Sequence, residues 1–566
     1  MSLLPGLDLG EPTATGTHLE PAAPVQHSLS KGSEWRFEVG WGCTVRVKLL
    51  AGTAELFGTE LASSQTYTFS GTKAAIYTWH GCTLEVSGTG EPEQSPGAPA
   101  PVAPGTGAGG CQVEYTAEET PMVEYANVHF ALEGMRQEAK AAAESSGTRR
   151  DGPRVLILGP EDAGKTSLAK ILTGYAVKSE QQPVVVNLDP SEGVLSVPGS
   201  LTAAAFRSMV DVEEGWGSSP MSGPSPVPVK LPIVYFYGLK SPLDADGSVY
   251  KPVVSRVALA VSGRLAEDRE SREAGVIIDT PGILGQGKKG SLEIIHHIVT
   301  EFSISTILVL GSERLYSTMA KSYDNKPTSN PNSPPSERIS VVKLTKSGGV
   351  VDRDTSFMKS LRESQIRTYF FGNPIPPTAS TALSTSSTSS TTTVTLSPHA
   401  QQLDFSTLSI YNIVLAGEDG DEDDDYDPSR LMTANDSLLP GDSGERESTP
   451  INPLQQLQQQ LQAAQGENNP NASSSTASTT TPAPFKKLTG PPTMALENTL
   501  LAITHAAPNA SPSEIRDASI MGFLYVVDVD DKKGKIRVLA PVGGRVPQRA
   551  ITWGRRWPGE VIGLVG

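Results

Sequence analysis

Hydrophobic and polar positions alternate along the first part of the chain. From Glu34 to about Gly90, short runs rich in β-branched and aromatic residues recur between glycine-containing turns. Runs of this kind at intervals of about ten residues are typical of a small all-β sandwich. The pattern predicts a disordered leader over residues 1–29 and an N-terminal β-sandwich domain over 30–122. A Pro-, Gly- and Ala-rich stretch within that domain predicts a flexible loop at 91–112.

Continuous apolar runs replace the alternation in the middle of the chain. RVLILG, PVVVNLDP, IVYFYG, GVIIDTPG and STILVLG are typical of buried strands, and ERISVVKL predicts one more. Apolar spacing in SLAKILTGYAVK and SLEIIHHIVTEFS predicts helices, and residues 123–145 begin strand-like and continue helix-prone. Strands that alternate with helices predict a parallel α/β sheet, interrupted by insertions at 214–228 and 322–336. We place this central domain at 123–372.

Low-complexity stretches dominate the last third of the chain. Residues 378–397 are rich in Ser and Thr, 418–427 in acids, and 455–465 in Gln. None of them can offset its ordering entropy by burial. We therefore predict disorder at 373–397 and 417–490.

Three islands in the same region carry apolar patterns. Residues 403–416 are strand-like, 494–506 are helix-like, and 519–544 predict two strands joined by a Lys/Gly turn. Together they predict a small α/β domain, so that 373–566 is a C-terminal domain with disordered insertions.

Composition narrows the class of protein. The 566 residues carry a net charge of −16, which is not the basic footprint of a chain that binds nucleic acid along its whole length. Cys43, Cys82 and Cys111 are too few for a disulfide scaffold, favour a reducing compartment, and lack metal-ligand spacing. No signal peptide and no apolar run long enough to cross a bilayer is evident, so we expect a soluble intracellular protein and no membrane partner.

One motif points to phosphate chemistry. GPEDAGKT places Gly159, Gly164, Lys165 and Thr166 as in G-x-x-x-x-G-K-[ST], between a predicted strand and a predicted helix. In such a loop the backbone N–H groups surround phosphates, the lysine reaches the β/γ-phosphates and the hydroxyl holds Mg²⁺. We expect Asp162, Ala163, Gly164, Lys165, Thr166 and Ser167 to line a nucleotide. The fold class expected is a multidomain α/β protein with a central P-loop NTPase sheet.

Two acidic residues follow predicted strands. Asp189 and Asp279 would point toward the phosphates, where they could hold Mg²⁺ together with Thr166 or orient an attacking group. The alternative for both is a helix cap or a turn aspartate. His296 and His297 lie on a predicted apolar helix, and partial burial without a catalytic role is the simpler interpretation.

The ordered regions resemble one family throughout. EWRFEV, AELFGTELA, GPRVLILGPEDAGKTSLAKIL, NLDPSEGVLSVPG, KSGGVVDRD and DASIMGFLYVVDVDDKKGKIRVLAPVGGRVPQRA are similar to segments of the Clp family. These are ATP-binding pre-mRNA cleavage and polyadenylation factors related to polynucleotide 5′-hydroxyl kinases. The NLDP motif and the tail are most similar to the fungal branch.

The resemblance implies a nuclear, ATP- and Mg²⁺-binding subunit of cleavage factor IA. It implies binding to a Pcf-type subunit that contacts the RNA polymerase II C-terminal tail, association with other cleavage factor IA subunits, and indirect association with pre-mRNA. It also implies that Glu34 and Lys73 of the N-terminal domain touch the adenine nucleotide. From the residues alone, both would be surface charges on a β-domain.

Whether the chain transfers phosphate stays open at this point. The kinase branch follows its acid with Gly-Gln-Gly, where this chain has Ser191-Glu192-Gly193. DTPGILG lacks the tryptophan of the kinase branch. That branch also has two arginines in its lid, whereas this chain keeps one as Arg353 and has Met358 at the second position. Losing a transition-state cation slows phosphoryl transfer strongly, so these departures favour a non-catalytic holder of ATP. If the chain is a kinase, Asp189 and Arg353 are the catalytic candidates. A GTPase-like switch is a further alternative, because DTPG resembles a switch motif. However, TKSGG is a poor substitute for the N-K-x-D motif that recognises guanine.

Overall fold

A computed structural model provides the structure. It describes residues 24–89, 111–146, 149–213, 232–372, 397–415 and 485–564. The predicted insertion at 214–228, the acidic and Gln-rich stretches, and most of the predicted disordered segments lie outside these residues. So does nearly all of the Ser/Thr-rich stretch.

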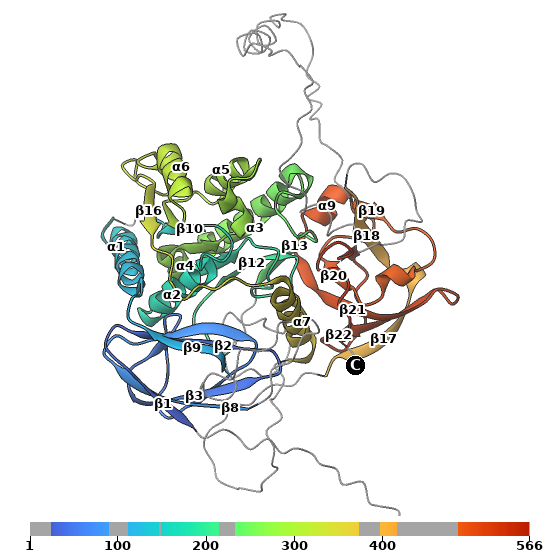
Figure 1. Ribbon diagram of the computed structural model, residues 1–566. Coiled ribbons are helices and arrows are strands. Elements are labelled where there is room, and N and C mark those ends of the chain that lie inside the picture. The colour runs from blue at the N-terminus through green and yellow to red at the C-terminus, as the bar shows by residue number, and fades with distance from the viewer. Residues whose placement is uncertain are drawn as a thin grey trace, which may run out of the picture. The chain divides into compact units, whose positions relative to one another are not determined.

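Two facing β-sheets form the N-terminal region (Figure 1). Alternate side chains of neighbouring strands, among them Trp35, Phe37, Val45 and Val47, are buried in the core between the sheets. One sheet has the order β1-β8-β3-β6 and the other β5-β4-β7-β2-β9. The strands are β1 (Val25–Leu29), β2 (Glu34–Val39), β3 (Thr44–Gly52), β4 (Glu55–Leu56), β5 (Thr59–Glu60), β6 (Thr66–Phe69), β7 (Thr72–Tyr77), β8 (Cys82–Thr89) and β9 (Cys111–Ala117).

Two ends of this region differ from the prediction. β1 lies within the predicted leader of residues 1–29, and β9 begins within the predicted loop of 91–112. Both are edge strands, which pair with β8 and β2. An edge strand needs few apolar residues, because its backbone pairing does most of the ordering, and its sequence pattern is correspondingly weak.

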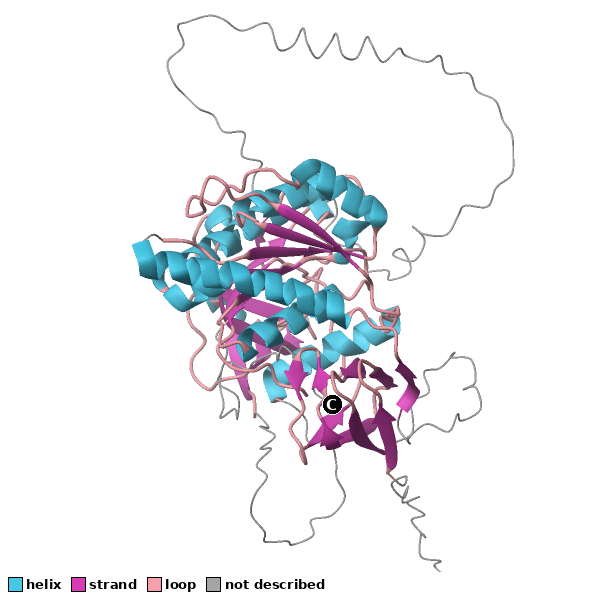
Figure 2. Ribbon diagram, turned by 90° about the vertical axis from the view of Figure 1, so that its left-hand side faces the viewer, coloured by secondary structure: helices cyan, strands magenta, loops and turns pink. Residues whose placement is uncertain are grey.

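The central region is a sheet in the order β13-β12-β11-β14-β10-β15-β16, with helices on both of its faces (Figure 2). The strands from β11 to β16 in that order are parallel, as expected. They are β10 (Arg154–Leu158), β11 (Val184–Asn187), β14 (Val276–Asp279), β15 (Thr306–Leu310) and β16 (Ser340–Leu344). The helices are α1 (Met122–Ser146), α2 (Lys165–Lys178), α3 (Tyr250–Glu267), α4 (Arg269–Ala274), α5 (Ser291–Glu301), α6 (Glu313–Tyr323) and α7 (Thr355–Phe371).

Two features of the central region depart from the expectation. β12 (Ser200–Ala205) and β13 (Ile233–Phe236) run antiparallel to their neighbours, so the sheet is mixed rather than parallel. β12 has the sequence SLTAAA, which carries no run of large apolar residues to announce a strand. Residues 123–145 do not begin as a strand. They are helical throughout and belong to α1, in which Met122, Tyr125 and Leu132 are buried at helical spacing.

The C-terminal region is a largely antiparallel sheet in the order β17-β22-β21-β20-β23-β18-β19. Its elements are β17 (His399–Asp404), β18 (Ser409–Ile413), β19 (Phe485–Lys487), β20 (Leu500–Thr504), α9 (Pro512–Arg516), β21 (Ile520–Asp530), β22 (Lys535–Ala540) and β23 (Ala550–Trp553). The two strands predicted within 519–544 are β21 and β22. The helix-like prediction for 494–506 was wrong, because β20 lies between β21 and β23 and its pairing overrides local propensity. β19 lies within the predicted disordered segment 417–490.

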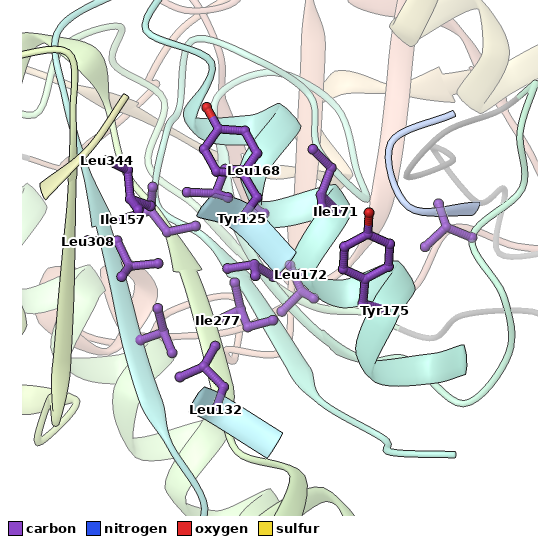
Figure 3. Close-up of a cluster of buried hydrophobic side chains, with 14 of the residues drawn as sticks. Tyr125, Leu132, Ile157, Leu168, Ile171, Leu172, Tyr175, Ile277, Leu308 and Leu344 are labelled. Carbon is purple, nitrogen blue, oxygen red and sulfur yellow. The ribbon is translucent and has the colours of Figure 1, made fainter. Parts of the chain in front are cut away.

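A hydrophobic core lies beside the glycine loop. Figure 3 shows Ile157, Ile277 and Leu308 of the central strands near Leu168 and Leu172 of α2. All of these side chains are almost completely buried. This packing fixes the strand before the loop and the helix after it.

Candidate nucleotide-binding site

The glycine loop joins β10 to α2 at the carboxyl edge of the parallel strands. In an open α/β sheet this is the edge where ligands bind. Gly164 precedes α2 with a φ of 86°, and the described residues give this helix N-terminus no side-chain cap. The first N–H groups of α2 are therefore open to a phosphate.

Two loop glycines are sites of close approach. A Cβ on Gly159 would lie 3.0 Å from the carbonyl oxygen of Leu310, and one on Gly164 would lie 3.0 Å from Val350 Cγ2. The Lys165 ammonium donates to the carbonyl oxygen of Pro160 at 2.8 Å, which holds it across the loop. The sequence therefore forms the compact strand–loop–helix unit that phosphate binding requires.

Asp279 joins the loop through its carboxylate. It ends β14, is 3% exposed, and its Oδ2 accepts the Thr166 hydroxyl at 2.6 Å. Burial raises the pKa of Asp279 to about 6, although Lys165 and Thr166 oppose the rise. Within the described part of the chain, its Oδ1 is buried and accepts no hydrogen bond.

This arrangement fits a magnesium ion. A hard cation takes a hydroxyl and a carboxylate oxygen as ligands and completes its shell with phosphate oxygens and water, so a protein cage of several acids is not required. The described residues contain no group of three or more His, Cys, Asp or Glu that could hold a metal. Thr166 and Asp279 would hold the ion, whose charge would offset that of the phosphates.

Asp189 lies in the segment of residues 189–193 after β11, here called the acidic turn. Its Oδ1 accepts from the backbone N–H of Ser191 at 2.9 Å and from the Ser191 hydroxyl at 2.6 Å. Its charge contributes to the raised pKa of Asp279, so the two carboxylates share one electrostatic environment. Asp189 thus makes the contacts of a turn aspartate, and its position beside Asp279 is also compatible with binding Mg²⁺.

Arg353 connects three parts of the site. It belongs to residues 345–354 between β16 and α7, here called the lid segment. Its Nε lies 2.7 Å from Asp162 Oδ1 in the glycine loop, and its Nη1 lies 2.8 Å from Glu192 Oε1 in the acidic turn. Burial alone would lower the pKa of Arg353, but the carboxylates of Glu192 and Asp162 raise it above its ordinary value. Met358, at the second lid position, is half-buried in the first turn of α7.

Glu34 reaches the lid segment through a neighbour. Glu34 is 4% exposed and pairs with Arg36, which lies two residues along the same face of β2. Burial raises the pKa of Glu34, and Arg36 opposes the rise. A Cβ on Gly348 or Gly349 would lie 3.2 or 2.7 Å from the Arg36 guanidinium, so these glycines admit the arginine. Arg36 was missed by sequence reasoning, and its period-two spacing from Glu34 was the available signal.

Lys73 contacts the same part of the chain. Its ammonium lies 3.0 Å from Glu38, 3.4 Å from the carbonyl oxygen of Asp352, and 5.0 Å from the Phe357 ring centroid. Lys73 therefore approaches residues 348–357 directly and Glu34 does so through Arg36, and Arg353 links this segment to the glycine loop. The segment thus contacts Lys73 and the Arg36 partner of Glu34, and direct nucleotide contacts by Glu34 and Lys73 stay predictions.

The two histidines of α5 lie elsewhere. His297 is half-buried and contacts the carbonyl oxygen of Lys251 at 2.9 Å, whereas His296 is exposed and stacks on Tyr323. His296 and Tyr323 help line a cavity of about 910 Å³ beside α5 and α6. That cavity contains none of the predicted nucleotide-binding residues. Among the described helices, none is both long and apolar enough to traverse a bilayer.

Comparison with known proteins decides the family. Residues 28–139 match a model described as the N-terminal β-sandwich domain of polyadenylation factor, and 159–372 match the P-loop of mRNA cleavage and polyadenylation factor CLP1. Residues 396–559 match the pre-mRNA cleavage complex II protein Clp1. Relatives named mRNA cleavage and polyadenylation factor from Coccidioides immitis and Aspergillus oryzae are each 67% identical, with 100% of both chains covered. The chain belongs to the Clp1 family.

Solved structures of Clp1 proteins share the fold. A wild-type Clp1p–Pcf11p complex matches with a TM-score of 0.67 and 25% identity, covering 94% of this chain and 97% of that one. A structure describing an extended Pcf11p–Clp1p interface and the basis for ATP loss in a glycine-to-arginine mutant matches with a TM-score of 0.68, 25% identity, and coverage of 94% and 98%. The β-sandwich, the P-loop region and the C-terminal sheet of this Clp1-family chain are thus family features.

Proposed function

We propose that this Clp1-family chain is an ATP-holding, non-catalytic assembly subunit of the nuclear pre-mRNA cleavage factor. It acts in the endonucleolytic cleavage that precedes polyadenylation of mRNA 3′ ends. Family membership supports the process, and the P-loop geometry supports the nucleotide. The Lys165 ammonium within the loop and the Thr166 hydroxyl on the buried carboxylate of Asp279 support the proposal that ATP and Mg²⁺ bind there.

The observation that carries the non-catalytic part is the position of Arg353. A phosphoryl-transfer enzyme needs cations that are free to meet charge developing on the transferred group. Here the guanidinium is engaged by Asp162 and Glu192, and the second lid position is Met358. Arg353 in this arrangement closes the lid segment over the loop and contributes little to transition-state stabilisation. The nucleotide is then a structural ligand.

We also propose that a Pcf-type subunit is the direct partner. The support is the solved complexes of Clp1p with Pcf11p. Through such a subunit the chain would connect to the RNA polymerase II C-terminal tail, to the other cleavage factor IA subunits, and indirectly to pre-mRNA.

One preparation tests both the nucleotide and the chemistry. The full chain is purified, its bound nucleotide is identified, and the same sample is given γ-labelled ATP and an RNA oligomer with a 5′-hydroxyl. We expect co-purified ATP, no transfer of label, and loss of ATP in Lys165→Ala. Robust transfer that disappears in Lys165→Ala and Asp189→Ala would establish the alternative, an active polynucleotide 5′-hydroxyl kinase.

A further inference from the structure

A tryptophan of the C-terminal region reaches the acidic turn. Trp557, which follows β23, is 7% exposed, and its indole N–H donates to the carbonyl oxygen of Pro190 at 2.7 Å. The same oxygen accepts the backbone N–H of Gly199 at 2.8 Å, so two donors from distant parts of the chain fix one peptide group. Pro190 directly follows Asp189, and Glu192 lies two residues further on.

The α7 helix, which follows the lid segment, packs against the same indole. The Arg362 guanidinium of α7 lies 4.6 Å from the Trp557 ring centroid, within the range of a cation–π contact. Three residues along α7, Gln365 accepts the backbone N–H of Gly193 at 3.0 Å. The acidic turn is therefore held at Pro190 by the C-terminal region and at Gly193 by α7.

The far end of α7 is anchored in the C-terminal sheet. Ile366 and Phe370 are fully buried in a core shared with Phe523 and Tyr525, and the Tyr369 hydroxyl accepts the backbone N–H of Phe523 at 3.1 Å. The lid segment, α7 and the C-terminal sheet thus form one continuous packed path to the acidic turn.

From these contacts we propose that Trp557 is a positioning residue through which the C-terminal region slows nucleotide release. The inference rests on the proposed ATP-holding function. The indole N–H sets the position of the acidic turn, and the acidic turn places Asp189 near Asp279 and Glu192 against Arg353. Without that hydrogen bond, the turn gains freedom, the hold on Arg353 loosens, and the lid segment opens more often.

The chain offers a matched control for this test. Trp553 is 3% exposed, and its indole N–H donates to the Thr499 hydroxyl at 2.8 Å, with both residues inside the C-terminal region. Trp557→Phe and Trp553→Phe each remove one buried indole N–H donor and keep an aromatic ring. Both should therefore lower the thermal midpoint to a similar extent.

The deciding measurement is the dissociation rate of a fluorescent, ribose-labelled ATP from the full chain, chased with unlabelled ATP and Mg²⁺. Loss of one hydrogen bond predicts release roughly three- to tenfold faster in Trp557→Phe and a rate close to wild type in Trp553→Phe. Equal rates in the two variants would overturn the proposal.

A second variant covers the case in which Trp557→Phe does not fold. Gln365 is half-buried on α7, and Gln365→Ala keeps helix propensity while it frees the Gly193 N–H. Faster release from this variant supports the proposal, and an unchanged rate contradicts it. If the wild-type chain binds no labelled ATP, the proposed function itself fails, which the wild-type control reveals separately.

Discussion

Glu192 and Arg353 form an ion pair of 2.8 Å between the acidic turn and the lid segment. The resemblance to the kinase branch aligns Ser191-Glu192-Gly193 with a Gly-Gln-Gly run. In that branch the neutral amide of a glutamine therefore takes the position of the Glu192 carboxylate. The carboxylate gives Arg353 a second anionic partner besides Asp162. Glu192 can therefore hold the lid segment closed, and it also pairs with the arginine that phosphoryl transfer would use.

Replacing that carboxylate by an amide should speed nucleotide release. In Glu192→Gln the side chain keeps its size and loses its charge, and Arg353 keeps Asp162. The pair is partly exposed, so the expected loss is about 0.5–1 kcal/mol, or roughly two- to fivefold in the dissociation rate of labelled ATP. Glu363→Gln is the control, because Glu363 lies 3.9 Å from Lys359 on an exposed face of α7. Identical ATP dissociation rates for the two variants would show that the Glu192–Arg353 ion pair does not slow nucleotide release.

Asp279→Asn should separate metal-dependent ATP binding from folding. Burial makes the charged carboxylate unfavourable, as its raised pKa indicates, and an amide oxygen can still accept the Thr166 hydroxyl. We expect the ligand-free variant to be as stable as wild type or more stable, by on the order of 1 kcal/mol. The extra thermal stabilisation that Mg²⁺ adds to ATP should disappear.

Thermal midpoints with ATP, with and without Mg²⁺, measure this effect. Thr280→Val is a neighbouring control that removes a buried hydroxyl bonded to the carbonyl oxygen of Ile157 at 2.6 Å. It should lower the midpoint by the loss of one hydrogen bond and leave the response to Mg²⁺ intact. A full Mg²⁺ response in Asp279→Asn would remove Asp279 from the metal site.

The sequence predicted best the elements whose own residues carry a clear apolar pattern, whereas β12 and β20 were missed although both are almost wholly buried. The β10, β11, β14 and β15 strands are continuous apolar runs because helices cover them on both sides, and the motif placed the glycine loop between β10 and α2. β12 and β1 lacked such runs. β20 was mistaken for a helix, because local propensity does not reveal the neighbouring strands that determine its pairing.

In the candidate site, too, the residues of local motifs could be predicted and the contacts between distant residues could not. Lys165, Thr166 and Asp279 follow from a local motif and a strand end. The contacts of Arg353 with Glu192 and of Trp557 with Pro190 join residues far apart in the sequence, and no periodicity encodes them. Arg36 was detectable in principle, because it shares a strand face with Glu34.

A methyl group on Gly349 should disturb the contact between the N-terminal region and the lid segment. The added Cβ would lie 2.7 Å from Arg36 Nε, which is closer than real Cβ atoms approach. Arg36 would have to move, and its pairing with Glu34 would weaken. We expect weaker ATP binding in Gly349→Ala, measured by titration calorimetry.

Gly134→Ala is the matched glycine substitution. No heavy atom lies within 4 Å of its added Cβ, and Gly134 is inside α1, where alanine is favoured by up to about 1 kcal/mol. This variant should be slightly more stable than wild type and bind ATP unchanged. If Gly349→Ala also binds ATP as wild type does, the lid contact with Arg36 does not contribute to affinity.

Acid should destabilise the packing of α1 on α2 through His129. This side chain is 7% exposed beside the Tyr175 ring and near Ser179, and it is flanked by Arg136 and Glu133. Burial lowers the pKa of His129 to about 4, and Arg136 contributes in the same direction. Above pH 6.5 the imidazole is neutral in both the folded and the unfolded chain. Between pH 6.5 and 4 the unfolded chain binds a proton that the folded chain does not, so stability falls as the pH falls, by up to about 3 kcal/mol. His129→Phe keeps a ring against Tyr175 and removes the titration. Thermal midpoints measured from pH 7.5 to 5 should therefore decline less steeply in the variant, and equal slopes would show that His129 does not contribute to the acid sensitivity.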